Sequence, residues 1–356
     1  MAFITLNTNK LKDNFKYLDN LFSENNIEWS IVTKVLCGNK TYLKETLSLG
    51  IKQVCDSRIT NLRAIKSINP NIETIYIKPP SKNIILQIIE IADISFNTDY
   101  YTLKLLSDEA GRKSKKHKVI IMLELGELRE GVLRDKFLEF FDKVYKLPNI
   151  EVMGIGANLS CLYGVLPNED KLIQLVLYKQ ILEMKFNKTI PIVSGGSSVT
   201  IPLILWNQLP TGINHFRVGE TLFFGTNVYN GNTIPEMHND VIKLFAQIIE
   251  LYEKPSVPSG ELCTNVEGKE FSFSEEDLSK TSFRAIIDVG ILDTNTEHLF
   301  PTNENYSIVG ASSDMVVIDL VENNDKLKVG DFIEFRVDYI AALHLLHSKY
   351  IDKNIE

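Results

Sequence analysis

The feature that most constrains the fold of this chain is a regular alternation of short apolar runs and helical patterns between residues 29 and 225. Each run has the length of a strand that is buried on both faces, as in a parallel sheet. The runs lie at 29–34, 52–56, 73–77, 93–96, 118–124, 151–157, 190–194 and 213–217. Eight such runs separated by amphipathic segments predict an α/β fold, a (β/α)8 barrel of the TIM type. A doubly wound open sheet has the same local pattern and stays open as an alternative.

The pattern changes after residue 240, where β-rich runs are separated by clusters of Gly, Pro, Asn and Asp. Such runs predict a second, mostly antiparallel β domain at the C-terminal end of the chain. We expect the barrel to cover residues 7–235. The second domain is expected to cover residues 236–356, together with a strand formed by residues 1–6.

Charge and cysteine usage narrow the class of partner and the compartment. The net charge of −8 argues against nucleic acid or an anionic membrane surface as the main partner. No run of about 18 uncharged apolar residues is present, so no membrane span is expected. The four cysteines are scattered without a C-x-x-C pair, which favours reduced thiols over disulfides or a zinc site. Because the N-terminus also lacks the pattern of a signal peptide, a cytoplasmic protein is expected.

A lysine, Lys34, ends the first apolar run and is directly followed by a turn and a helical pattern. A lysine at the end of a buried strand is costly unless it is paired, neutralised or reaches solvent. One interpretation is that Lys34 extends its amine to the surface. The other is a partly desolvated, nucleophilic amine that forms a Schiff base with a carbonyl cofactor.

Functional residues of a barrel lie where strands end and loops begin. That rule selects Lys34, Asp56, Arg129, Asn158, Ser197, Ser198, Arg217 and Gly219. Arg129 offers a planar fork for a carboxylate, although a surface ion pair with Glu127 or Glu130 would also explain it. No metal-binding spacing is found among the six histidines, which are interpreted as hydrogen-bonded or solvent-facing side chains.

The loops after the seventh and eighth runs both contain glycine, at Ser194-Gly-Gly-Ser-Ser198 and at Arg217-Val-Gly219. Glycines allow close backbone approach, and amides at a helix start together with hydroxyls can bind a phosphate. These two loops form the usual phosphate site of a barrel, which favours that interpretation. A capped helix after a tight turn is the alternative for the first loop.

Taken together, these segments resemble the alanine racemase-like (fold type III) enzymes that use pyridoxal 5′-phosphate (PLP), and most of all the ornithine racemase branch. The resemblance extends over nearly the whole chain. Its motifs are Val32-Thr-Lys34-Val, Asp56-Ser-Arg-Ile-Thr-Asn61, Glu127-Leu-Arg-Glu-Gly131, Ser194-Gly-Gly196, Arg217-Val-Gly-Glu220 and Gly310-Ala-Ser-Ser-Asp314.

The resemblance implies a role for each matching residue. Lys34 resembles the lysine that binds PLP covalently and transfers a proton. Arg217 resembles the arginine that faces the pyridine nitrogen, and Arg129 resembles the arginine near the substrate carboxylate and the second base. The remaining implied PLP contacts are Asn158, Ser197, Ser198, Gly219, Glu220 and Tyr339. Ser313 and Asp314 resemble positions where a partner subunit meets the substrate, which implies a homodimer with shared active sites.

The chain departs from this family at the second catalytic base. Alanine racemases carry a tyrosine in a Gly-Tyr motif, whereas Ile291 occupies that position here. The candidates for a replacement base are Cys161, Tyr163 and Asp293. A further difference is Met122, which aligns with a lysine that is carbamylated in many alanine racemases.

The resulting expectation is a PLP-dependent amino-acid racemase that acts on a basic amino acid such as ornithine or lysine. An enzyme of the same fold with changed chemistry (decarboxylation, elimination or epimerisation) is one alternative. A non-catalytic PLP-binding protein is the other.

Overall fold

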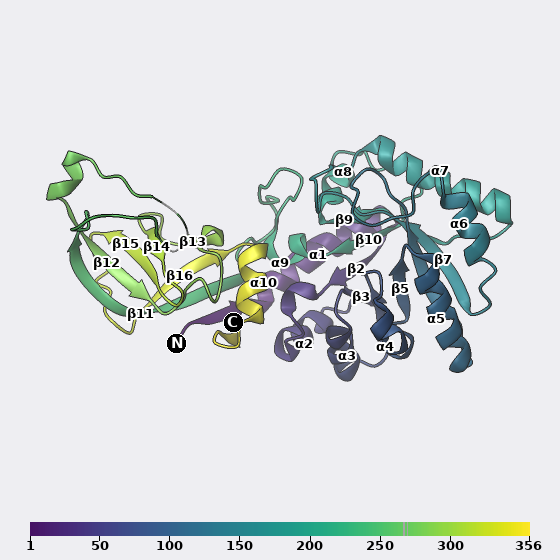
Figure 1. The fold of residues 1–356 in the computed structure, drawn as a ribbon, viewed down its shortest axis with the longest axis horizontal. Helices are drawn as coiled ribbons and strands as arrows, with labels where there is room; N and C mark the ends of the chain where they lie inside the picture. The colour runs from purple at the N-terminus through teal and green to yellow at the C-terminus, as the bar shows by residue number, and fades with distance from the viewer. Residues whose placement is uncertain (266–267, 269) are drawn as a thin grey trace. The chain divides into compact units, whose positions relative to one another are not determined.

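The computed structural model describes residues 1–265, 268 and 270–356. The chain divides into two compact units, which Figure 1 shows as ribbons. We call residues 9–239 the barrel unit and residues 1–8 together with 240–356 the β unit.

The barrel unit is built on a parallel sheet with the order β8-β7-β6-β5-β4-β3-β2-β10-β9. Its strands are β2 (Glu28–Val32), β3 (Gln53–Asp56), β4 (Glu73–Tyr76), β5 (Ile94–Asn97), β6 (His117–Met122), β7 (Ile150–Gly156), β8 (Ile192–Ser194), β9 (Gly196–Ser197) and β10 (His215–Val218). Only Gly195 separates β8 from β9, and the two segments pair with β7 and β10 respectively. One interrupted strand therefore closes an eight-stranded barrel, and an open doubly wound sheet is excluded.

The helices of the barrel unit surround the strands (Figure 1). They are α1 (Thr8–Glu24), α2 (Lys40–Ser48), α3 (Ile59–Ile68), α4 (Ile85–Ile91), α5 (Tyr100–Arg112), α6 (Phe137–Val144), α7 (Glu169–Phe186), α8 (Ile201–Leu205) and α9 (Glu220–Phe224). Successive strands contribute apolar side chains to one barrel core, including Val32, Cys55, Ile75, Ile94, Phe96, Ile120 and Met122. This packing explains why the strands are nearly continuous apolar runs.

The β unit is a mostly antiparallel sheet with the order β13-β16-β11-β12-β15-β14. Its elements are β1 (Phe3–Leu6), β11 (Ile242–Pro255), β12 (Thr281–Ile287), β13 (Leu299–Pro301), β14 (Ser307–Ala311), β15 (Val316–Val321), β16 (Phe332–Val337), α10 (Tyr339–His347) and β17 (Asp352–Ile355). The N-terminal strand β1 joins this unit, since it pairs antiparallel with β11 and parallel with β17. No helix in the described part of the chain is both long and apolar enough to cross a membrane.

Candidate active site

Lys34 is the first residue of a short 3-10 helix, η1 (Lys34–Leu36), which follows β2 directly. The preceding residue, Thr33, is hydrogen-bonded to the neighbouring strand β3. The Thr33 hydroxyl donates to Asp56 Oδ2 at 2.8 Å, and the Thr33 N–H donates to the Cys55 carbonyl at 2.9 Å. Asp56 is fully buried, accepts a further hydrogen bond from Asn61 Nδ2 at 3.2 Å, and has its pKa raised by burial. The backbone that presents Lys34 is therefore held in place by β3.

The exposure of Lys34 bears on the two interpretations of this residue. The side chain is exposed, as the first interpretation expected, and is not partly desolvated as the second did. Because β2 ends at Val32 and η1 begins at Lys34, the lysine lies at the rim of the barrel and not inside it. Position at the strand end, and not burial, is what distinguishes this lysine.

Lys34 lines a cavity of about 300 Å³ at the carboxyl ends of the barrel strands. Four other predicted site residues line the same cavity, namely Arg129, Asn158, Cys161 and Arg217. The cavity also contains residues that the sequence interpretation did not assign to the site: Ser57, Ile77, Lys78, Pro79, Phe96, Met122 and Glu130. Several of them lie at the end of β6 or just after β3 and β4, and this position is the only sequence signal that pointed to them.

Arg217 lies on β10 and is buried, with 6% of its surface exposed. Its Nη1 donates to the Ser194 carbonyl at 2.8 Å and to Ser194 Oγ at 2.5 Å, while Nη2 donates to the Ala157 carbonyl at 2.9 Å. The guanidinium also lies over the Phe96 ring, 5.2 Å from its centroid. No described residue accepts a hydrogen bond from its Nε. That N–H and one N–H of Nη2 remain for a ligand in the cavity.

Cys161 is held in the cavity by a buried carboxylate on the preceding loop. Glu127 is 1% exposed and accepts hydrogen bonds from five backbone N–H groups, those of residues 160–163 and 165. Burial opposes ionisation, but these hydrogen bonds prevail and lower the pKa of Glu127 to about 2. The Cys161 thiol itself accepts a hydrogen bond from Asn158 Nδ2 at 3.0 Å. No pattern in the sequence indicated this arrangement.

Arg129 forms a two-pronged ion pair with the neighbouring carboxylate of Glu130, through both Nε and Nη2. This is the local pairing that was weighed as the alternative explanation for the arginine. The pair nevertheless lines the cavity together with Cys161. Arg129 is thus placed to meet a ligand and is also oriented by Glu130.

The predicted phosphate-binding loops lie side by side in the barrel unit. β9, which contains Ser197, pairs with β10, and the Thr221 N–H in α9 donates to Ser198 Oγ at 3.3 Å. Gly219 precedes α9, and a Cβ there would lie 3.0 Å from the Val32 carbonyl, two residues before Lys34. The first turn of α9, which begins at Glu220, therefore starts beside the end of β2.

Two other predicted residues, Ser313 and Asp314, lie together in the β unit. The loop after β12 is bonded to the turn between β14 and β15, because Ile291 N–H donates to the Ser312 carbonyl and Leu292 N–H to the Ser313 carbonyl. Asp314 in the same turn packs on Gly290, where a Cβ would lie 2.4 Å from the Asp314 backbone. Ser313 and Asp314 are both exposed.

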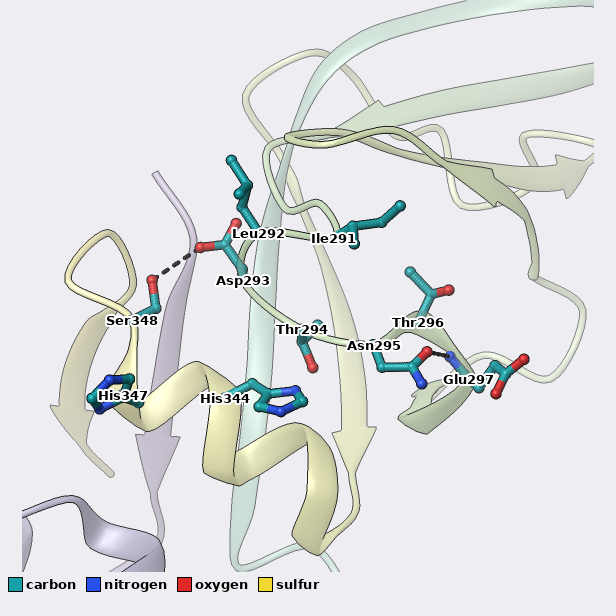
Figure 2. A pocket seen from close by; sticks show the side chains of 10 residues that line it. All are labelled: Ile291, Leu292, Asp293, Thr294, Asn295, Thr296, Glu297, His344, His347 and Ser348. Atoms are coloured by element: carbon teal, nitrogen blue, oxygen red, sulfur yellow. Dashed lines mark hydrogen bonds between the residues drawn. The ribbon is translucent and has the colours of Figure 1, made fainter. Parts of the chain in front are cut away.

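Asp293 lines a pocket of about 690 Å³ in the β unit, formed by residues 291–297 with His344, His347 and Ser348 (Figure 2). Ser348 Oγ donates to Asp293 Oδ1 at 2.9 Å, and the Gly290 N–H donates to Oδ2 at 3.4 Å. Both carboxylate oxygens of Asp293 thus accept hydrogen bonds from residues of the β unit. Tyr339, the last predicted contact, is the first residue of α10, whose N-terminus is capped by Asp338.

The barrel residues fit PLP by their chemistry. A lysine at the rim has the amine that forms a covalent bond to an aldehyde, and the buried Arg217 retains donors for a ring nitrogen. Ser198 and the first turn of α9 supply a hydroxyl and backbone N–H groups for a phosphate. These are the complementary groups that an anionic, aldehyde-bearing pyridine ring requires.

The chain belongs to the alanine racemase family, because the family model for the alanine racemase N-terminal domain matches residues 6–227. Over its full length it is similar to ornithine racemase of Acetoanaerobium sticklandii, with 38% identity covering 99% of each chain. It is also similar to lysine racemase of Thermotoga maritima, with 29% identity covering 99% of this chain and 98% of the other.

Solved structures agree with the architecture. Alanine racemase from Bartonella henselae with covalently bound pyridoxal phosphate has a TM-score of 0.74 at 16% identity, covering 100% of this chain and 99% of the other. Alanine racemase from Streptomyces coelicolor has a TM-score of 0.76 at 11% identity, covering 99% and 97%. The predicted barrel with a C-terminal β domain and the predicted family are therefore confirmed.

Proposed function

We propose that this chain is a PLP-dependent racemase that interconverts the enantiomers of a basic amino acid, ornithine or lysine. The full-length similarity to proteins named ornithine racemase and lysine racemase supports the class of substrate. The observation that carries the proposal is the cavity in which Lys34, Arg217, Arg129 and Cys161 meet. A cavity with a lysine, a buried ring-nitrogen donor and a second proton-transfer group has the parts that racemisation needs.

Bound PLP would supply an electron sink that makes the Cα–H of the attached amino acid acidic. Lys34 holds the cofactor and transfers a proton between its Nζ and Cα on one face. Arg217 donates hydrogen bonds and cannot give up its proton at ordinary pH, so it leaves the ring nitrogen unprotonated. An unprotonated ring nitrogen would make PLP a weaker electron sink, and a weaker sink favours return of the proton to Cα over transamination.

Cys161 is our choice for the proton-transfer group on the other face. It lines the same cavity as Lys34 and is fixed there by Glu127. Asp293 is less suitable, because both of its oxygens already accept hydrogen bonds. Tyr163 is exposed, as Cys161 is, but it is not among the residues that line this cavity. A thiol that cycles between thiol and thiolate can accept a proton from Cα and return it.

The remaining contacts are assigned by the same chemistry. Arg129 would bind the substrate carboxylate, and Ser197, Ser198, Gly219 and Glu220 would hold the phosphate, with Asn158 and Tyr339 as further cofactor contacts. Ser313 and Asp314 are proposed to meet the substrate of a partner subunit in a homodimer. The exposed apolar residues of the same loops, Ile291 at 41% and Leu292 at 76%, support burial of this surface by a partner.

The test of the function is incubation of each enantiomer of ornithine, lysine, alanine and serine with the holoenzyme in deuterated water, followed by chiral analysis. We expect inversion with deuterium at Cα for ornithine or lysine. Exchange without inversion would favour the changed-chemistry alternative, and no exchange with any amino acid would favour a PLP-binding protein.

Cofactor attachment is tested by absorbance. A lysine-bound PLP should give a band near roughly 420 nm, which Lys34→Ala should lose. Lys78→Ala is the matched control, because Lys78 lines the same cavity. A band that survives in Lys34→Ala but disappears in Lys78→Ala would reassign the anchor.

Oligomeric state and compartment are part of the same proposal. Light scattering coupled to size-exclusion chromatography should give about twice the mass of the 40.5 kDa chain. We place the protein in the cytoplasm, which the four free cysteines support. Fractionation of cells that express the full chain checks this placement, and recovery outside the cytosolic fraction would refute it.

A further inference from the structure

Behind Arg217, a chain of polar side chains runs through the barrel, from the buried Arg217, Ser194 and His215 to the half-buried Gln53 and Glu73. We call it the Arg217 relay; its members are Arg217, Ser194, His215, Gln53 and Glu73. The successive distances are 2.5 Å from Arg217 Nη1 to Ser194 Oγ, 2.6 Å from Ser194 Oγ to His215 Nδ1, 2.8 Å from His215 Nε2 to Gln53 Oε1 and 2.5 Å from Gln53 Nε2 to Glu73 Oε2. A hydrogen-bonded row of this length inside an apolar barrel requires an explanation beyond packing.

The direction of every hydrogen bond in the relay follows from its two ends. An ionised Glu73 only accepts, so the Gln53 amide nitrogen must face it and the Gln53 oxygen must face His215. The Ser30 hydroxyl also donates to Gln53 Oε1, and its oxygen lies 3.0 Å from His215 Nε2. Because two oxygens face Nε2, the imidazole carries its proton there. Burial and the nearby Arg217 charge lower the pKa of His215 to about 3, so the ring is neutral and Nδ1 is an acceptor.

At the other end, Arg217 can only donate, so Ser194 Oγ accepts from it. The Ser194 hydroxyl proton is then directed to His215 Nδ1. All hydrogens point from Arg217 toward Glu73, and each bond polarises the next one. The relay makes Ser194 a stronger acceptor than an isolated hydroxyl would be.

We propose that Ser194 and His215 are positioning residues for Arg217, which hold its guanidinium in a single orientation with the remaining N–H groups available to the cavity. The proposal rests on the proposed function where it concerns PLP, because those N–H groups are the ones assigned to the ring nitrogen. A guanidinium that rotated away would leave the ring nitrogen open to water and protonation. By holding Arg217 in place, the relay would favour racemisation over half-transamination.

Three variants test the role. His215→Leu removes the acceptor for Ser194, and His215→Asn keeps an amide oxygen that can accept in its place. The matched control is His117→Leu, because His117 is also buried in the barrel, bonds to Ser95 Oγ at 2.8 Å and is not part of the relay. Both leucine variants should lower the stability of the barrel, so stability alone does not separate them.

The first measurement uses the apoprotein. Nitrogen-15 NMR of selectively labelled protein should show His215 as the Nε2–H tautomer and slow exchange of the Arg217 guanidinium protons. That exchange should become about tenfold faster in His215→Leu and stay near the wild-type rate in His117→Leu and His215→Asn. An Nδ1–H tautomer, or equal exchange in both leucine variants, would overturn the proposal.

The second measurement uses the holoenzyme. In His215→Leu we expect the dissociation constant of PLP to rise about tenfold and the ratio of racemisation to half-transamination to fall by a similar factor. His215→Asn should recover most of both, and His117→Leu should match the wild type in both. Failure of the wild type to bind PLP would refute the proposed function, while the apoprotein measurement would still decide the relay.

Discussion

The carboxylate of Glu127 accepts the backbone N–H of Cys161 at 2.7 Å, although the two residues lie 34 positions apart. Four further N–H groups of the same loop bond to this carboxylate. A buried charge is tolerated there because the loop supplies the donors that water would otherwise supply. One side chain thus determines where the thiol of the candidate active site lies.

Glu127→Gln should loosen this loop. An amide keeps one acceptor oxygen but directs an NH2 group at backbone donors, so we expect the free energy of unfolding to fall by about 1–3 kcal/mol. Catalytic activity should fall more than PLP affinity, since Cys161 moves while Lys34 and Arg217 do not. Urea denaturation and PLP titration measure the two effects. Glu124→Gln is the control, because Glu124 accepts one backbone N–H, that of Gly126 at 2.5 Å; an equal loss in both variants would contradict the prediction.

Stability should decrease on the acid side because two buried histidines resist protonation. Burial is the main cause that lowers the pKa of His215 to about 3 and of His117 to about 4, from an ordinary 6.5. Below about pH 6.5 the unfolded chain binds protons that the folded chain excludes, so the contribution is present above pH 6.5 and is lost as pH falls toward 4 and 3.

Urea denaturation at about pH 7.5 and about pH 5 measures this slope. In His117→Asn one of the two titrating groups is gone, so the loss of stability between these pH values should be smaller than in the wild type. A slope in His117→Asn as steep as that of the wild type would mean that His117 is already protonated in the fold.

Cys161→Ser should separate the two faces of the proposed reaction. A serine hydroxyl is a far weaker acid than a thiol, so racemisation should fall by about 100-fold or more. Exchange of Cα–H for deuterium should persist from the enantiomer whose proton faces Lys34. Chiral analysis with mass detection in deuterated water measures both quantities. Cys263→Ser, which alters an exposed cysteine of the β unit, should leave them unchanged, and a racemisation rate that survives in Cys161→Ser would return the choice to Asp293 or Tyr163.

Gly196→Ala should strain the barrel where β9 pairs with β10. A Cβ at this position would lie 2.2 Å from Cγ of the Phe216 ring, which is fully buried. We expect a loss of about 1–3 kcal/mol in the free energy of unfolding from overpacking. Gly310→Ala, where a Cβ would meet nothing within 4 Å, should change stability by less than about 0.5 kcal/mol. Thermal and urea unfolding measure the stability of the two variants. Equal stabilities would mean that the Phe216 ring leaves room for a Cβ at position 196.

Much of the barrel could be predicted from local sequence, because a strand buried on both faces must be apolar along its whole length. All eight predicted runs correspond to strands, from β2 (Glu28–Val32) to β10 (His215–Val218). The interruption at Gly195 was not predicted, since a break of one residue leaves no periodic signal. Lys34 and Arg217 were selected by their places at strand ends, and both line the cavity.

The residues that support the site were not predicted. Glu127 was weighed as a partner for Arg129 and as part of a family motif, whereas it bonds to residues 160–163 and 165. His215 was interpreted as a hydrogen-bonded or solvent-facing side chain, and its bonds to Ser194 and Gln53 come from two other strands. A single sequence carries no signal for such pairings because their members are brought together by strand order and register.

The sequence by itself determined the alternation that makes a barrel, the lysine and arginine at its rim, and the family. These features are local: each depends on the periodicity or spacing of a few consecutive residues. The tertiary structure alone decided that Lys34 is exposed, that Glu127 holds the Cys161 loop, and that a row of polar side chains backs Arg217. Burial and hydrogen-bond partners depend on which distant segments the closed sheet brings into contact, and closure is a property of the whole chain.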